Sequence, residues 1–170
     1  NTSFADKPIG IRTIGGQLFI AIVDGTTGSP ISVASLWSYD GTAPGMLQLA
    51  TFQTAIERGA AMSPPVDFGG NAYFAAATRD LGSELWRSDG TSSGTVLVRD
   101  IRPGAGASDP TYLTISAGRV FFSANDGVSG KELWSSDGTS AGTAIVADIR
   151  TGSSTSHSNP SNLVDVTGTL

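Results

Sequence analysis

The sequence contains no cysteine and only one histidine among its 170 residues. Without cysteine the chain has no disulfides, thiol catalysis, iron–sulfur clusters or zinc sites with cysteine ligands. Ten Lys and Arg against fifteen Asp and Glu give a net charge of −5. Such a chain lacks the basic surface that neutralises a phosphate backbone, so nucleic acid is not an expected partner.

Long apolar runs are also missing. The longest, residues 18–23, is far shorter than the roughly 20 residues that cross a membrane, so we expect no transmembrane segment. Short β-branched and aromatic runs separated by Gly, Asp-Gly and Pro indicate a single all-β domain, residues 1–170. A helical turn is considered only at 47–59, where Leu49, Phe52 and Ile56 are spaced as on a helix face.

The three tryptophans mark an internal repeat. Aligned on Trp37, Trp86 and Trp134, the sequence reads SLWSYDGT, ELWRSDGT and ELWSSDGT, at spacings of 49 and 48 residues. Gly-Thr at 94–95 and 142–143, and Asp-Ile-Arg at 100–102 and 148–150, keep the same phase. A period of this length is typical of β-propeller blades, which have roughly 40–50 residues.

These copies resemble the bacterial ELWxxDGT repeat proteins, whose unit reads Glu-Leu-Trp, two variable residues, Asp-Gly-Thr, two more residues and Gly-Thr. The second and third copies match this unit throughout. The first copy departs from it, since Ser35 replaces Glu and Met46 replaces Thr, and a longer segment precedes its tryptophan. The resemblance covers nearly the whole chain. It implies a secreted or other extracytoplasmic protein and no particular activity.

Four strands can be identified within one unit, at 112–115, 120–124, 132–136 and 144–148. Asp-Gly turns suit the hairpins between them, because Gly accepts a positive φ. We therefore predict a β-propeller-like array of four-stranded antiparallel blades. The units span roughly 8–52, 63–101 and 110–150, and 160–170 begins a further unit.

The tryptophans and the aspartates of the Asp-Gly turns are interpreted as a structural motif. Each tryptophan is expected to pack between blades, and stacking on a sugar or a base is the alternative. The motif residues are Trp37, Asp40, Trp86, Asp89, Trp134 and Asp137.

Three units and a fraction do not close a ring, since closed propellers have roughly four to eight blades. The sequence is therefore expected to be part of a longer chain, or to be completed by further copies or by another protein. In each case its C-terminal end, from residue 163 onward, is covered by the chain's own continuation or by a protein partner.

The residues available for catalysis or for metal binding are few. His157, the only histidine, lies in a Ser-rich segment with no recognisable partner, so we expect a non-enzymatic protein without a bound cofactor. Asn125-Asp126-Gly127 and Asp137-Gly138 are interpreted as turns. Calcium is the alternative, although the dense Asp-x-Asp spacing of a dedicated calcium loop is absent.

One face of the array carries the longer loops, 25–34, 78–83, 102–109, 125–131 and 150–159. Arg102 and Arg150 recur there at equivalent positions, each two residues after an aspartate. Each Asp–Arg pair either ties one blade to the next or presents a guanidinium to an acidic sugar or a carboxylate. Asp126 and Lys131 complete the candidate ligand-binding residues.

The sequence thus favours a non-catalytic extracytoplasmic module whose loop face binds a glycan, a surface polymer or a protein. The alternative is a structural accessory subunit of a larger extracytoplasmic or membrane-associated assembly, held through its open strand edges and uncovered blade faces.

Overall fold

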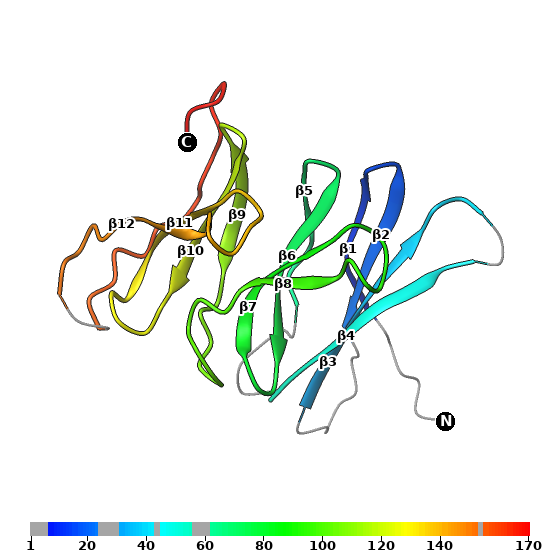
Figure 1. Cartoon of the computed structure of the whole chain (residues 1–170), viewed down its shortest axis with the longest axis horizontal. Coiled ribbons are helices and arrows are strands. Elements are labelled where there is room, and N and C mark those ends of the chain that lie inside the picture. Colours follow the sequence, from blue (N-terminus) through cyan, green and yellow to red (C-terminus); the bar gives the residue numbers. More distant parts are fainter. Residues whose placement is uncertain (1–6, 24–30, 43–44, 56–61, 153–154) are drawn as a thin grey trace.

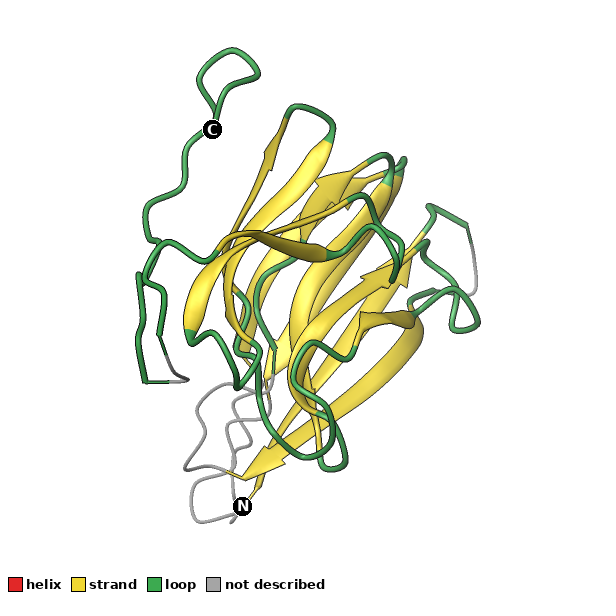
Figure 2. Ribbon diagram, turned by 60° about the vertical axis from the view of Figure 1, so that its left-hand side comes forward, coloured by secondary structure: helices red, strands yellow, loops and turns green. Residues whose placement is uncertain are grey.

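The computed structural model describes residues 7–23, 31–42, 45–55, 62–152 and 155–170. In these residues the protein is all-β, with twelve strands in three four-stranded antiparallel sheets that stand side by side (Figures 1 and 2). No helix in the described part of the chain is long and apolar enough to cross a membrane. The predicted fold class is confirmed at this level.

Each sheet contains one repeat unit as a simple meander, so that neighbouring strands in sequence are neighbours in the sheet. The first sheet consists of β1 (Lys7–Ile14), β2 (Gln17–Val23), β3 (Ile31–Tyr39) and β4 (Leu47–Ala55). The second consists of β5 (Val66–Phe68), β6 (Asn71–Thr78), β7 (Gly82–Ser88) and β8 (Val96–Arg99). The third consists of β9 (Thr111–Ser116), β10 (Arg119–Asn125), β11 (Lys131–Ser136) and β12 (Ala144–Ala147).

The helical alternative for 47–59 is wrong where the structure describes the segment, because 47–55 forms β4. A β-bulge explains the misleading spacing. The register between β3 and β4 shifts between Leu36 and Trp37, which pair with Ala50 and Gln48. The extra residue turns both Leu49 and Phe52 toward the core, three positions apart as on a helix. Residues 56–59 lie outside the described part.

The same bulge recurs in all three sheets, always opposite the Leu-Trp pair of the repeat motif, with Leu49, Val98 or Val146 as the extra residue of the fourth strand. A bulge bends its strand and increases the local twist. The fourth strand of each sheet is therefore bent at the same point, beside the motif.

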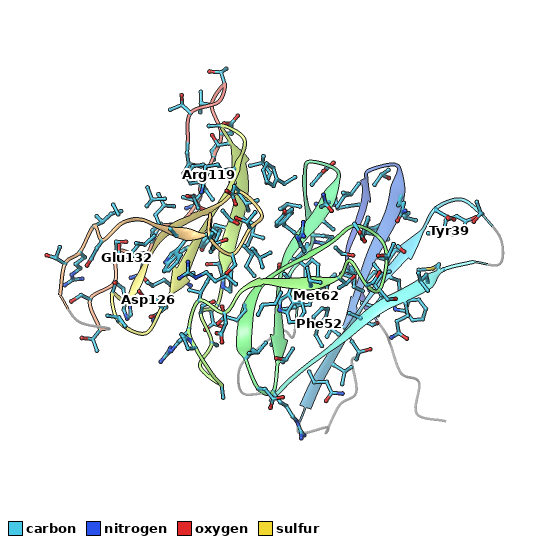
Figure 3. All side chains as sticks on the ribbon, in the orientation of Figure 1. Tyr39, Phe52, Met62, Arg119, Asp126 and Glu132 are labelled. Carbon is cyan, nitrogen blue, oxygen red and sulfur yellow. The ribbon has the colours of Figure 1, made fainter. Side chains whose placement is uncertain are left out.

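The core lies in two layers between the sheets, and β6 contributes to both. Alternate residues of β6 face opposite ways: Phe74 belongs to the layer between the first and second sheets, and Tyr73 to the layer between the second and third. Figure 3 shows Phe52 and Met62 in the first of these layers. The middle sheet is covered on both faces, which explains why six consecutive residues of β6 are buried.

All three motif tryptophans are expected between blades; Trp86 and Trp134 lie at these layers, whereas Trp37 does not. Trp86 packs edge-to-face on Phe52 of the preceding sheet, with ring centroids 5.2 Å apart, and Trp134 is 5 % exposed in the second layer. Trp86 and Trp37 are both half-buried, but Trp86 packs against the first core layer, whereas no described sheet covers the side of the first sheet on which Trp37 lies. Trp37 Nε1 donates to Ser35 Oγ at 2.9 Å.

The C-terminal residues lie beside β9 and repeat its backbone conformation (Figure 1). Positive φ angles at Asn159, Asn162 and Thr167 match those at Asp109, Tyr112 and Ala117. Side-chain hydrogen bonds hold the segment: Thr114 Oγ1 donates to the carbonyl of Leu163 at 3.1 Å, and Ser116 Oγ donates to Asp165 at 2.5 Å.

The two-layer core makes a prediction about matched positions on β2 and β6. Phe74 is fully buried between two sheets, whereas Ile20, at the equivalent position, is half-buried on the uncovered face. We expect Phe74→Ala to lower the free energy of unfolding by about 3–5 kcal/mol, and Ile20→Ala by about 1 kcal/mol. Urea unfolding followed by tryptophan fluorescence measures both. Equal losses would contradict the layer assignment.

Candidate functional site

The three Asp-Gly-Thr turns have one geometry. In each turn an oxygen of the aspartate accepts the threonine N–H at 2.9 Å and the threonine hydroxyl at 2.7 Å. These bonds hold the pKa of Asp40, Asp89 and Asp137 below its ordinary value, with the bond from the threonine hydroxyl as the largest cause. The motif aspartates therefore shape turns, as predicted.

The Gly-Thr pair after each turn packs against the same carboxylate. A Cβ on Gly94 or Gly142 would lie 2.0 Å from the motif aspartate, so only glycine fits there. The hydroxyl of the following threonine, Thr95 or Thr143, forms a 2.7 Å hydrogen bond with the serine that ends β7 or β11. The spacing between the two motif halves is thus a packing requirement.

The first unit lacks the serine and the threonine that form this hydrogen bond in the other two units. Tyr39 stands where the other units have the β-strand serine, and Met46 stands where they have the threonine. Nothing lies within 4 Å of a Cβ built on Gly45. Only the Asp40–Thr42 turn is retained, and the expected departure of this copy is confirmed.

The motif glutamate is a fully buried loop anchor. Glu84 on β7 is 0 % exposed. Its carboxylate accepts Ile101 N–H at 2.9 Å and the hydroxyl and N–H of Ser108 at 2.7 and 3.2 Å. It therefore holds both ends of the loop that leads from the second sheet to the third. A buried carboxylate is tolerated because backbone and hydroxyl donors satisfy it.

Glu132 on β11 repeats this arrangement one unit later. It accepts Ile149 N–H at 3.1 Å and Ser158 N–H and hydroxyl at 3.0 and 2.5 Å. Two residues before each glutamate, Gly82 and Gly130 have positive φ, and a Cβ on either would lie within 2.4 Å of a backbone oxygen of the anchored loop. Gly-x-Glu is therefore one device that seats a long loop against a strand.

Burial raises the pKa of Glu84 to about 7, although hydrogen bonds from Ser108, Ile101 and Arg102 act in the opposite direction.

In the first unit Val33 and Ser35 stand where the other units have the Gly and the Glu of this Gly-x-Glu device. Both β3 and β4 have nine residues, whereas β7 has seven and β8 has four. The first unit thus relies on a longer strand pair at this position.

The predicted ligand-binding residues are partly brought together. Arg102 lies exposed in the loop anchored by Glu84, and its side chain contacts the Cβ position of Gly127 at 3.1 Å, in the loop that carries Asp126. Lys131 begins the next strand and is half-buried. Arg150 is exposed in the following loop, one unit further along. Figure 3 shows Asp126 and Glu132 in this third unit.

Asp100 and Arg102 do not tie two sheets together through an ion pair. Among the described residues, Asp100 accepts Gly104 N–H at 3.3 Å and Arg102 donates to the carbonyl of Ala107 at 3.4 Å. Both bonds stay inside one loop. Arg102 does approach the next unit, since its Nε lies 3.1 Å from the place where a Cβ on Gly127 would be.

Two of the predicted long loops are shorter than expected. Strand β3 already begins at Ile31, so only 25–30 of the segment 25–34 is not strand, and those residues lie outside the described part. Strands β6 and β7 are joined by residues 79–81, since Thr78 pairs with Gly82. The pairing of β6 with β7 extends as far as this tight turn because Gly82 adopts a positive φ there.

The remaining chemical candidates have structural roles. One carboxylate oxygen of Asp126 accepts the N–H groups of Val128 and Ser129 at 2.8 and 2.7 Å, which is the predicted turn. No group of three or more potential metal ligands exists among the described residues. Nδ1 of His157 accepts Lys131 N–H at 2.7 Å, so the histidine pins the loop to β11.

Sequence reasoning missed the serines that complete the glutamate anchors. The signal was present, since Ser-Asp-Pro at 108–110 recurs as Ser-Asn-Pro at 158–160, 50 residues later and two residues beyond the spacing of the tryptophans. The role of each serine became visible only with the fold, because Ser108 lies 24 residues from Glu84 and Ser158 lies 26 residues from Glu132.

The packing of Gly142 against Asp137 predicts a non-additive pair of substitutions. Gly142→Ala displaces the carboxylate and forfeits its bonds to Thr139, and we expect it to lower the free energy of unfolding by about 1–3 kcal/mol. In an Asp137→Ala background the same change should cost much less. Urea unfolding of the four proteins measures the coupling. Additive losses would contradict the contact.

The buried Glu84 predicts a pH dependence of stability. Its pKa is about 7 in the folded protein against an ordinary 4.5, so the folded state binds this proton more tightly. The stabilisation is complete below pH 4.5 and is lost as the pH rises through 7. We expect the urea midpoint to fall across this window and then to level off.

Glu84→Gln is the control, because it removes the titration and keeps the size of the side chain. We expect this variant to show no fall between pH 4.5 and 7. The turn aspartates act only at more acidic pH, since their pKa values are lowered. The same fall in wild type and variant would rule out Glu84 as its source.

Comparison with known proteins identifies no relative: no family model matches this chain, and no curated protein is significantly similar to it. Membership of the ELWxxDGT repeat family therefore remains a proposal, carried by the motif copies themselves.

Proposed function

We propose that this protein is a non-catalytic binding module that acts through its loop face. The observation that carries the proposal is the pair of buried glutamates, which fix the long loops at both ends against β7 and β11. Loops held by a rigid scaffold are the usual carriers of binding residues. Fixing them in advance also reduces the entropy lost when a ligand binds.

Two arginines give this face a repeated recognition element. Arg102 and Arg150 are exposed and follow the anchored residues Ile101 and Ile149 directly. A guanidinium binds carboxylates through paired hydrogen bonds. The favoured ligand is therefore an acidic glycan or surface polymer with carboxylates along its length. The resemblance to ELWxxDGT proteins supports an extracytoplasmic location for such binding.

Binding of trigalacturonate, an acidic trisaccharide, tests this proposal. We expect Arg102→Ala and Arg150→Ala each to weaken binding about tenfold, the effect of losing one charge-assisted contact. Arg12→Ala, which removes an exposed arginine from β1, serves as the control and should leave the affinity unchanged. Isothermal titration calorimetry at low salt measures all three. Equal affinities for all variants would contradict a role of the loop arginines.

A second function, assembly through the outer face of the third sheet, is favoured by the exposure of two residues. Ile149 is 62 % exposed, whereas its equivalents Phe52 and Ile101 are 2 % and 5 % exposed. Val146 is likewise 49 % exposed, and its equivalent Val98 is 5 % exposed. This face is one half of the interface that the other sheets complete. We propose that a further four-stranded unit covers it, in a propeller-like array.

Sedimentation of the chain across a concentration series tests the assembly. We expect association at micromolar concentration, and Ile149→Asp should abolish it without loss of folding because the side chain is exposed. Val128→Asp is the matched control, since Val128 is 72 % exposed in the β10–β11 loop. A 17.3 kDa monomer at every concentration, with or without the substitution, would contradict the proposal.

A further inference from the structure

A groove of about 430 Å³ lies between β5 and β9, the edge strands of the second and third sheets. Ser63, Pro64 and Val66 line one side, and residues 110–113 line the other. This volume is in the range of small-molecule sites, about 300–1,000 Å³. None of the lining residues is charged, so the groove offers nothing to pair with an ionic ligand.

Tyr112 is the unusual residue of this groove. Its φ is +58°, in the left-handed region that bulky residues rarely adopt. It lies in a β-bulge: Thr111 pairs with Ser123 and Thr114 with Phe121, so two residues of β9 oppose one of β10. Bulges of this kind redirect a side chain. The redirected ring is 51 % exposed.

The backbone does not require tyrosine at this position. The equivalent residue in the C-terminal segment is Asn162, where φ is +54°, whereas Gly10, the equivalent in the first unit, does not have a positive φ. Glycine and asparagine are the residues that tolerate this conformation. A half-exposed tyrosine accepts the strain without the compensation of a buried ring. Its ring therefore serves the surface of the groove.

Hydroxyl-bearing residues also line the groove. Thr111 Oγ1 is buried and has no hydrogen-bond partner among the described residues. Ser63 Oγ, on the opposite wall, accepts Ala75 N–H at 3.0 Å and donates to the carbonyl of Pro64 at 3.3 Å. An aromatic ring flanked by hydroxyls and apolar residues matches a pyranose, which has an apolar C–H face and polar hydroxyls.

An extended peptide fits this groove poorly, although both walls are edge strands. Pro64 and Pro110 have no N–H to donate to an added strand, and the bulge at Tyr112 interrupts the edge. The uncharged lining likewise disfavours an acidic sugar. These features leave a neutral saccharide as the ligand that the groove suits.

We propose that the groove between β5 and β9 binds a neutral saccharide, with one pyranose ring stacked on Tyr112. The inference rests on the proposed binding function but uses neither Arg102 nor Arg150. With both sites, one module would bind a polysaccharide at two of its sugars, a charged sugar at the loop arginines and an uncharged sugar in the groove.

Saturation-transfer NMR with cellotriose and maltotriose, two neutral trisaccharides, tests the inference. We expect binding of at least one at millimolar concentration, and we expect Tyr112→Gly to weaken it about tenfold. Glycine keeps the positive φ, so this variant should fold at least as stably as the wild type and show an unchanged or higher urea midpoint. Tyr112→Phe keeps the ring and should retain binding.

Three outcomes would overturn the inference: no binding of either neutral trisaccharide, equal binding by wild type and Tyr112→Gly, or a large fall in the urea midpoint of Tyr112→Gly, which would make the ring a packing element. Trigalacturonate separates this result from the loop-face proposal. If it binds through the arginines while the neutral sugars do not bind, only the groove is refuted. If neither binds, both proposals fail.

Discussion

The structure depends on a carboxylate that is buried inside each complete unit. Glu84 and Glu132 each sit on the third strand of a sheet and accept hydrogen bonds from the residue that leaves the fourth strand and from the serine that enters the next unit. A buried carboxylate without donors would cost several kcal/mol. The loop must therefore return to this point, and the position of the next sheet follows from it.

The other residues of the motif also help to join one sheet to the next. Leu36 and Leu85 face the following sheet, whereas Trp86 and Trp134 face the preceding one. Adjacent Leu and Trp residues face opposite ways because side chains alternate along a strand. Asp-Gly-Thr closes the hairpin, and Gly-Thr locks onto the same turn. The motif thus supplies the hairpin turn of a sheet and the residues that pack on the neighbouring sheet at each side.

The proposed functions use what this scaffold leaves free. The motif residues are occupied within the fold, so binding falls to residues that the motif does not need: the arginines of the anchored loops and Tyr112 at the start of β9. The outer face of the third sheet is different. Val146 and Ile149 are exposed there, whereas the residues at the equivalent positions of the other units are buried. Its exposure points to another unit rather than to a small ligand.

The sequence alone determined the all-β class, the number of units and the strands within them. The hydrophobic period, the Asp-Gly turns and the repeat spacing can all be read along the chain without knowledge of the fold. The sequence also placed Trp86 and Trp134 between sheets and the motif aspartates in turns. It misjudged 47–55 because a bulge shifted Leu49 and Phe52 onto one face, a result of strand pairing and not of local spacing. The partners of Glu84 and Glu132 lie 17 to 26 residues away, and the groove at Tyr112 needs two sheets to exist. Such contacts are decided by how sheets pack, so only the tertiary structure could show them.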